Sequence, residues 1–161
     1  RKNRGYRNSY SLDPIYGEKN FPDNKAGNEL KAFLHRNKAF LLPYYSDNTK
    51  QKDNEYALVL SHMLVNNFMY HKGKFAADSS MVELYRITKK GGKIVVLGFQ
   101  IYDKIKKFGK TNGVDWTHPK HSWQKKELHD HYKKMFPDAT ISVKESATTP
   151  FLYLLSILKK N

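Results

Sequence analysis

Two continuous apolar runs stand out in the pattern of hydrophobic and polar positions along the chain. Residues 56–60 read Tyr-Ala-Leu-Val-Leu, and residues 93–98 read Lys-Ile-Val-Val-Leu-Gly. Short runs that are apolar throughout, rather than at every second position, are typical of central strands covered on both faces. The sequence therefore predicts two buried, parallel strands at these positions.

The segment just before the second run has the pattern of an amphipathic helix. Ser80 and Glu83 have the spacing of a capping box, and apolar residues recur at helical spacing after them. The pattern ends in two lysines and the glycine pair at 91–92, which is typical of a helix end. We expect a helix over residues 80–90.

The rest of the chain continues to alternate strands with helices. The predicted strands are residues 8–12, 39–45, 140–143 and 151–158, and the predicted helices lie at residues 30–34 and 122–136. The last two strands are close enough in sequence for a terminal hairpin, and residues 103–120 form a basic loop insertion. This order predicts a single α/β domain over residues 1–161 with a mostly parallel sheet.

The chain is strongly basic and contains no cysteine. It carries 29 Lys and Arg against 15 Asp and Glu, a formal net charge of +14. Such a charge favours a polyanionic partner, and RNA is the partner we expect, although a lysine-rich solvated surface would give the same composition. The absence of cysteine excludes disulfides, thiolate metal sites and a cysteine nucleophile. We expect an intracellular, soluble domain with no membrane span, in a compartment that the sequence does not indicate.

Several segments are similar to class I S-adenosylmethionine (SAM)-dependent methyltransferases. Residues 56–64 resemble the fourth strand of that family, and residues 83–97, which contain Lys-Lys-Gly-Gly, resemble its helix-then-strand segment. Residues 127–160 resemble its closing helix and β-hairpin, and residues 10–13 its second strand. The resemblance implies a Rossmann-like, methyltransferase-like sheet with a C-terminal antiparallel hairpin, and SAM as the cofactor.

Two features of the family pattern have no counterpart in this chain. No strand with a glycine-rich Gly-x-Gly turn precedes Asp13, and Ala57 stands where the family has Asp. We therefore expect a partial domain, whose first strand and helix come from an upstream segment or a partner chain, or a relic that no longer binds SAM in the usual way. On this expectation, the chain alone binds SAM poorly.

The resemblance also implies a cofactor site at the carboxyl ends of the strands. Asp13 would accept the ribose hydroxyls, Asp47 would hold the adenine amino group, and Ser61 ends the central strand. The adjacent His62 is the candidate catalytic base, because a neutral imidazole accepts a proton near pH 7. Plainer interpretations remain open: Asp13 closes an Asp-Pro turn, Asp47 is a loop residue, and His62 is an exposed or internally satisfied histidine.

The basic loop at residues 103–120 alternates lysines with aromatic residues. Lysines can contact phosphates while an aromatic ring stacks on a base. The candidate nucleic-acid-binding residues are Lys104, Lys106, Lys107, Phe108, Lys110 and Trp116. The alternative is a solvated loop whose aromatic side chains belong to the core.

The histidines at positions 118, 121, 129 and 131 suggest a metal site. Residues 129 and 131 are two apart on a predicted helix and so point to different sides, and no carboxylate stands at ligand spacing. We expect no metal site.

The favoured function is a SAM-dependent methyltransferase domain that acts on or with RNA. The alternative is an inactive, methyltransferase-like RNA-binding component of a ribonucleoprotein such as a ribosome. A basic nuclease or toxin domain that uses the histidines is a third interpretation.

Overall fold

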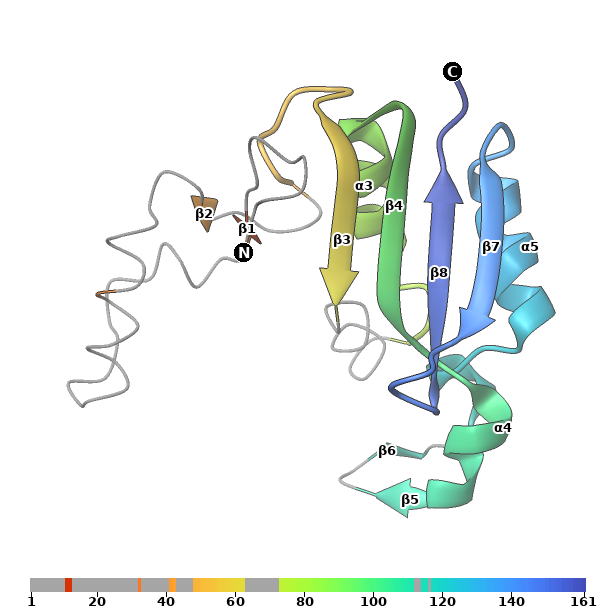
Figure 1. Cartoon of the computed structure of the whole chain (residues 1–161). Helices are drawn as coiled ribbons and strands as arrows, with labels where there is room; N and C mark the ends of the chain where they lie inside the picture. Colours follow the sequence, from red (N-terminus) through yellow and green to blue (C-terminus); the bar gives the residue numbers. More distant parts are fainter. Residues whose placement is uncertain are drawn as a thin grey trace. The chain divides into compact units, whose positions relative to one another are not determined.

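Four strands form the central sheet of the described part of the chain. In sheet order they are β3 (Tyr56–His62), β4 (Thr88–Gln100), β8 (Leu152–Leu158) and β7 (Thr140–Glu145) (Figure 1). The computed structural model describes residues 11–12, 32, 41–42, 48–62, 73–111, 114–115 and 117–161.

The strand directions confirm the main predictions from the apolar runs. β3 and β4 are neighbours and run parallel, with Val59 opposite Ile94. β8 runs antiparallel to both of its neighbours, β4 and β7. The two predicted parallel strands therefore lie side by side, and the predicted terminal hairpin is formed by β7 and β8. The expected burial of both strands is wrong for β3, which lies at the edge of the described sheet and has Leu60 70% exposed.

Two helices, α3 (Asp78–Ile87) and α5 (Lys125–Met135), lie on one face of the sheet (Figure 1). Their apolar sides and the sheet residues that face them form a single buried cluster, as the periodicity predicted. The largest fully buried side chains of this cluster are Trp123, Tyr132, Phe99, Met81, Ile94 and Leu128.

The predicted boundaries of the helix at 80–90 are wrong at both ends. The helix begins at Asp78, and its N-cap residue, Ala77, makes no side-chain capping hydrogen bond, so the expected capping box is not formed. The helix ends at Ile87 because Thr88 is already extended and pairs with Tyr56. The glycine pair therefore lies within β4 and does not end the helix.

The basic insertion contains short elements of its own. These are α4 (Tyr102–Ile105), the 3₁₀ helix η3 (Lys106–Phe108), a small antiparallel ribbon of β5 (Lys110–Thr111) and β6 (Val114–Asp115), and η4 (Pro119–His121). The predicted helix at 122–136 is confirmed as α5. Glu127 accepts a hydrogen bond from the backbone N–H of Gln124 at 3.4 Å, which caps its first turn.

The chain divides into two units, residues 1–50 and residues 51–161. In the first unit, β1 (Ser11–Leu12) and β2 (Leu41–Leu42) pair in parallel, in agreement with the predicted strands at 8–12 and 39–45. The helix predicted at 30–34 lies outside the described residues, apart from the helical Ala32. No helix in the described ranges is long and apolar enough to cross a bilayer.

Candidate functional site at the carboxyl edge of the sheet

The carboxyl ends of β3 and β4 meet at one edge of the sheet. His62 is the last residue of β3 and pairs with Leu97, and Gln100 ends β4 three positions later. Open α/β sheets bind ligands in the crevice outside the carboxyl ends of their parallel strands. We call this end, with the loops that follow the two strands, the carboxyl edge.

Only two of the four residues expected at the cofactor and catalytic site lie within the described residues. Ser61 and His62 lie together at the end of β3, as expected. Asp13 and Asp47 lie outside the described residues.

Three buried polar atoms at the carboxyl edge have no hydrogen-bond partner among the described residues. They are the hydroxyls of Ser61 and Ser122 and the indole Nε1 of Trp123. Ser122 and Trp123 lie beside the end of β4, where the backbone N–H of Trp123 donates to the Gln100 carbonyl at 2.8 Å. A buried polar group without a partner costs on the order of 1–3 kcal/mol. Of the three, only the Ser61 hydroxyl belongs to a residue that is not fully buried, since Ser122 is 1% and Trp123 0% exposed.

The two loops of the carboxyl edge contact each other directly. Lys74 N–H, before α3, donates to the carbonyl of Lys120, before α5, at 2.6 Å. The Lys74 ammonium lies 4.9 Å from the Trp123 ring centroid and forms an ion pair with Glu127. Phe75 packs edge-on against the same indole at 5.5 Å. The Lys74 side chain is only 11% exposed. Its contacts with Trp123 and Glu127 therefore hold the loop that follows β3 against the loop that follows β4 and the first turn of α5.

A carboxylate–imidazole pair lies between the same two helices. His131 Nε2 is 3.0 Å and 3.1 Å from the two carboxylate oxygens of Asp78. The imidazole centroid is 5.1 Å from the rings of both Phe75 and Trp123. A carboxylate that accepts the Nε2 proton leaves Nδ1 as the basic nitrogen of a neutral imidazole. The Tyr132 hydroxyl donates to the same Asp78 carboxylate at 3.4 Å.

The sequence did not point to the Asp78–His131 pair. The two residues are 53 positions apart, and the sequence suggests His131 only together with the other histidines, as a metal ligand or as part of a nuclease or toxin site. The one feature of the sequence that could indicate a packed role for His131 is its place next to Tyr132, on the apolar side of the predicted helix. No group of three or more metal-ligating side chains occurs within the described ranges.

Most lysines of the basic insertion have acidic partners. Lys104 pairs with Glu145, and Lys106 pairs with Asp103 at 2.8 Å. Lys110 Nζ is 4.0 Å from Asp115, at the limit of an ion pair.

The contact with Asp103 also raises the pKa of Lys106. Lys107 Nζ lies 5.9 Å from the ring centroid of the half-exposed Phe108. Trp116, the last of the candidate nucleic-acid-binding residues, lies outside the described residues.

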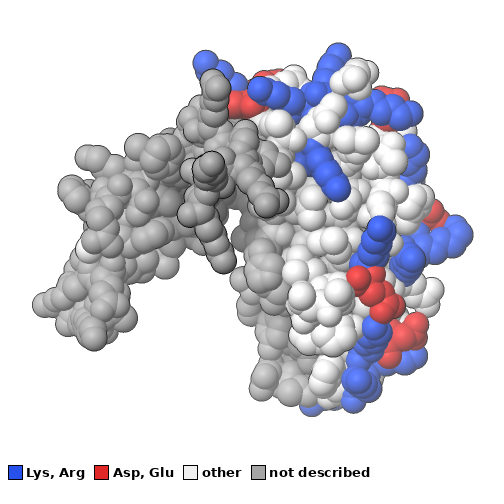
Figure 2. All heavy atoms as spheres, in the orientation of Figure 1, with Lys and Arg blue, Asp and Glu red and all other residues white. Residues whose placement is uncertain are grey.

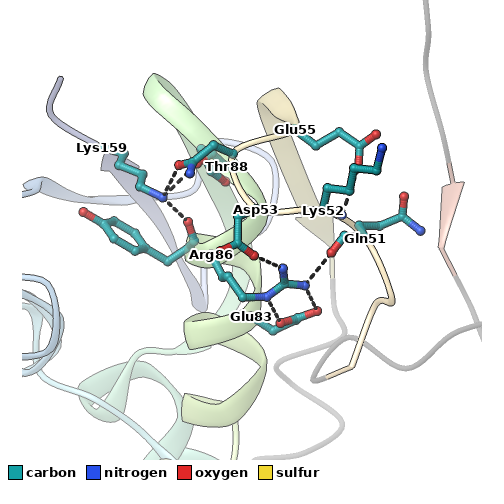
Figure 3. Close-up of polar contacts among 10 residues, drawn as sticks. Gln51, Lys52, Asp53, Glu55, Glu83, Arg86, Thr88 and Lys159 are labelled. Atoms are coloured by element: carbon teal, nitrogen blue, oxygen red, sulfur yellow. Dashed lines mark hydrogen bonds and ion pairs between the residues drawn. The ribbon is translucent and has the colours of Figure 1, made fainter.

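A denser polar network lies at the opposite end of the sheet, where β3 and β4 begin (Figure 3). Arg86 donates to both carboxylate oxygens of Glu83 at 2.7 Å, to the Gln51 carbonyl at 2.8 Å, and to Asp53. These hydrogen bonds raise the pKa of the guanidinium. The Lys159 ammonium donates to carbonyls at the end of α3 and to Asn54. Because these partners join α3, the segment before β3 and the end of β8, we assign the network to stability.

Comparison with solved structures gives the wider context of this fold. A SAM-dependent methyltransferase from Methanosarcina mazei superposes with a TM-score of 0.54 at 13% identity, over 92% of this chain and 80% of that chain. The chain has a methyltransferase-like fold.

The chain also superposes on other solved structures, at similarly low sequence identity. The PH0226 protein from Pyrococcus horikoshii OT3 matches with a TM-score of 0.62 at 10% identity, over 95% of this chain and 72% of that chain. TehB from Haemophilus influenzae matches with a TM-score of 0.53 at 14% identity, over 97% of this chain and 51% of that chain. No family model matches the sequence, and a search of curated proteins gives no significant match.

Proposed function

We propose that this protein is a SAM-dependent methyltransferase-type domain that binds its cofactor at the carboxyl edge and associates with RNA. The observation that carries the proposal is the parallel β3–β4 pair, with β8 antiparallel beside it, in a fold similar to that of the M. mazei methyltransferase. This arrangement places the ends of two parallel strands at one edge, where open α/β sheets take their ligands.

The residues available to the cofactor fit its chemistry. The resemblance assigns the ribose hydroxyls to Asp13 and the adenine amino group to Asp47, and both of these residues lie outside the described residues. Ser61 supplies a buried hydroxyl that has no partner among the described residues. When bound, SAM supplies an activated methyl group.

The chain's own contribution to the reaction is positioning and proton transfer. An acceptor held in line with a reactive group gains most of its rate from orientation. His62, at the carboxyl end of β3, is the residue we propose as the base that takes the acceptor's proton.

Ligand-observed NMR with SAM tests the cofactor proposal and suits an affinity as weak as about 1 mM. We expect saturation transfer to SAM that S-adenosylhomocysteine competes away. Asp13→Ala is expected to reduce this transfer. The matched control Asp130→Ala, which removes an exposed carboxylate paired with Lys126 on α5, is expected to leave it unchanged. No transfer from the parent chain, or equal transfer in both variants, would refute the proposed site.

The association with RNA is supported by the net charge of +14. Its test is retention of single-stranded RNA on a filter in the absence of SAM. RNA binding without any SAM binding would favour the second candidate, an inactive methyltransferase-like component of a ribonucleoprotein. Ala57, which stands where the methyltransferase pattern has Asp, is the observation that favours this candidate.

A further inference from the structure

Four exposed lysines lie at the amino edge of the sheet, the end at which β3 and β4 begin. Lys89, Lys90 and Lys93 belong to the first half of β4, and Lys160 follows β8. Two backbone hydrogen bonds bring these segments together: Gly91 N–H donates to the Lys159 carbonyl at 2.8 Å, and Lys159 N–H donates to the Gly92 carbonyl at 3.0 Å. We call the four side chains the amino-edge lysine surface.

The backbone holds this surface on a tight turn. The β3–β4 register jumps from Tyr56 opposite Thr88 to Leu58 opposite Lys93, so residues 89–92 bulge out of the ladder. Figure 1 shows β4 turning back at this point, close to the end of β8. Gly91 has a φ of +72°, a conformation that side chains rarely adopt. The turn therefore presents Lys89 and Lys90 from ordered backbone.

The charges of this surface are not neutralised within the described part of the chain. None of its lysines has an acidic partner there, whereas Lys104, Lys106 and Lys110 of the insertion each have one. Figure 2 shows Lys and Arg side chains at this end of the sheet, with some Asp and Glu among them, and further Lys and Arg along the side of the molecule.

Two acidic side chains of the segment before β3, and the neighbouring Lys159, have partners of their own. Asp53 is paired with Arg86, and Glu55 accepts the backbone N–H of Lys52 at 3.1 Å. The neighbouring Lys159 ammonium points inward, to the carbonyl of Thr88 at 2.9 Å. Burial lowers the pKa of Lys159, the charge of Asp53 partly opposes this, and the charge of Lys90 makes a smaller contribution that also lowers it.

We propose that the amino-edge lysine surface binds the phosphate backbone of RNA. Uncompensated, exposed ammonium groups are the side chains that release counterions when they contact phosphates, whereas lysines already paired with carboxylates must first break those pairs. The inference rests on the proposed association with RNA and not on methyl transfer. It places the RNA anchor at the end of the sheet opposite the carboxyl edge.

Two quadruple variants that remove the same number of charges test the location. The amino-edge variant carries Lys89→Gln, Lys90→Gln, Lys93→Gln and Lys160→Gln, and the loop variant carries Lys104→Gln, Lys106→Gln, Lys107→Gln and Lys110→Gln. Binding of a single-stranded oligouridine is measured for the parent and both variants over a series of salt concentrations. Each phosphate contact contributes about 0.7 to the slope of log affinity against log salt for a single strand.

We expect the amino-edge variant to flatten the slope by about 3 units, and the loop variant by less than about 1 unit. A slope that falls equally in both variants, or more in the loop variant, would overturn the location. A parent chain that binds no RNA would overturn the proposed association itself, and with it this inference.

A membrane partner is a separate outcome of the same experiment. If the parent binds phosphatidylserine vesicles more strongly than RNA at the same salt concentration, and the amino-edge variant loses that binding, then the surface serves a membrane and the proposal fails. Thermal melting of both variants within a few degrees of the parent confirms that the sheet is intact, because exposed lysines contribute little to stability.

Discussion

Replacing Arg86 by methionine is expected to weaken the sheet end at which α3 stops and β3 begins. The Arg86→Met substitution keeps the aliphatic stem of the side chain and removes the guanidinium. It breaks four hydrogen bonds: two to Glu83, one to the Gln51 carbonyl and one to Asp53. The consequence depends on how far each partner is shielded from water.

The Glu83 carboxylate is only 12% exposed, whereas that of Asp53 is 70% exposed. A hydrogen bond to a charged group contributes about 1.5–3 kcal/mol when shielded. Since the Arg86 side chain is itself 34% exposed, we take the lower end of that range, about 1.5 kcal/mol, for the Glu83 contact. The exposed pair with Asp53 adds about 0.5 kcal/mol. The hydrogen bond to the part-buried Gln51 carbonyl adds nothing to this sum, because water can replace it. The expected loss in the free energy of unfolding is therefore about 2 kcal/mol.

Urea unfolding followed by far-ultraviolet circular dichroism measures this loss. With a dependence of about 2 kcal/mol per molar urea, the midpoint is expected to fall by about 1 M. Arg86→Lys keeps the charge but loses the planar fork, so about half the loss is expected. Asp53→Asn is expected to cost only about 0.5 kcal/mol. An Arg86→Met midpoint equal to that of the parent, or a larger effect of Asp53→Asn, would refute the assignment of the network to stability.

Two further substitutions test the core. Burial, with a smaller effect of Asp78, raises the pKa of Tyr132 well above its ordinary value. The buried, neutral Tyr132 hydroxyl therefore makes its full contribution to the free energy of unfolding below about pH 10. This contribution is lost as the pH rises toward the pKa of Tyr132 in the folded state. Above about pH 10 the parent should lose stability faster than Tyr132→Phe in urea melts, and equal pH slopes would contradict this prediction. Gly92→Ala would place a Cβ 2.8 Å from the Lys89 carbonyl oxygen and 3.0 Å from that of Ala57. It should cost about 1–3 kcal/mol in the same melts, and an unchanged midpoint would show that the turn can shift.

The elements that depend on long-range burial were predictable from the sequence. The runs at 56–60 and 93–98 are confirmed as the parallel strands β3 and β4. The expected cover on both faces is not confirmed, because Leu60 of β3 is 70% exposed and Val95 and Leu97 of β4 are only partly buried. The helix at 122–136 was predictable because its inner side chains repeat at helical spacing.

The boundary between α3 and β4 was not predictable from local patterns. Lys-Lys-Gly-Gly after an apolar stripe is a strong signal for a helix end, yet the strand begins three residues before Gly91. Pairing of Thr88 with Tyr56 decides the outcome, and the Thr88 hydroxyl supports it by donating to the Leu84 carbonyl at 2.6 Å. A tertiary contact of this kind overrides a local preference.

The sequence predicted at which edge of the sheet the candidate site lies, but it did not predict the side-chain contacts there. Ser61 and His62 were expected at the end of a parallel strand because an apolar run stops there. The contact of Lys74 with Trp123 and the pairing of Asp78 with His131 join loops and helices that are about 50 positions apart in sequence. Spacing rules act over one or two turns of helix, so they carry no information about such pairs.

The position of β8 in the sheet sets the order in which this unit can assemble. Within the sheet, β7 is joined to the parallel pair β3–β4 through β8, which follows all three strands in the chain. Until β8 inserts, with Lys93 opposite Leu158 and Gln100 opposite Leu152, β7 is separate from the β3–β4 pair, and the edges of β4 and β7 that β8 will cover are unpaired. Closing such long loops costs entropy before any strand pairing repays it, so folding is expected to be slow for a unit of this size. A nascent chain that still lacks residues 152–158 therefore exposes the edges of β4 and β7, which are the segments that a folding chaperone would have to shield.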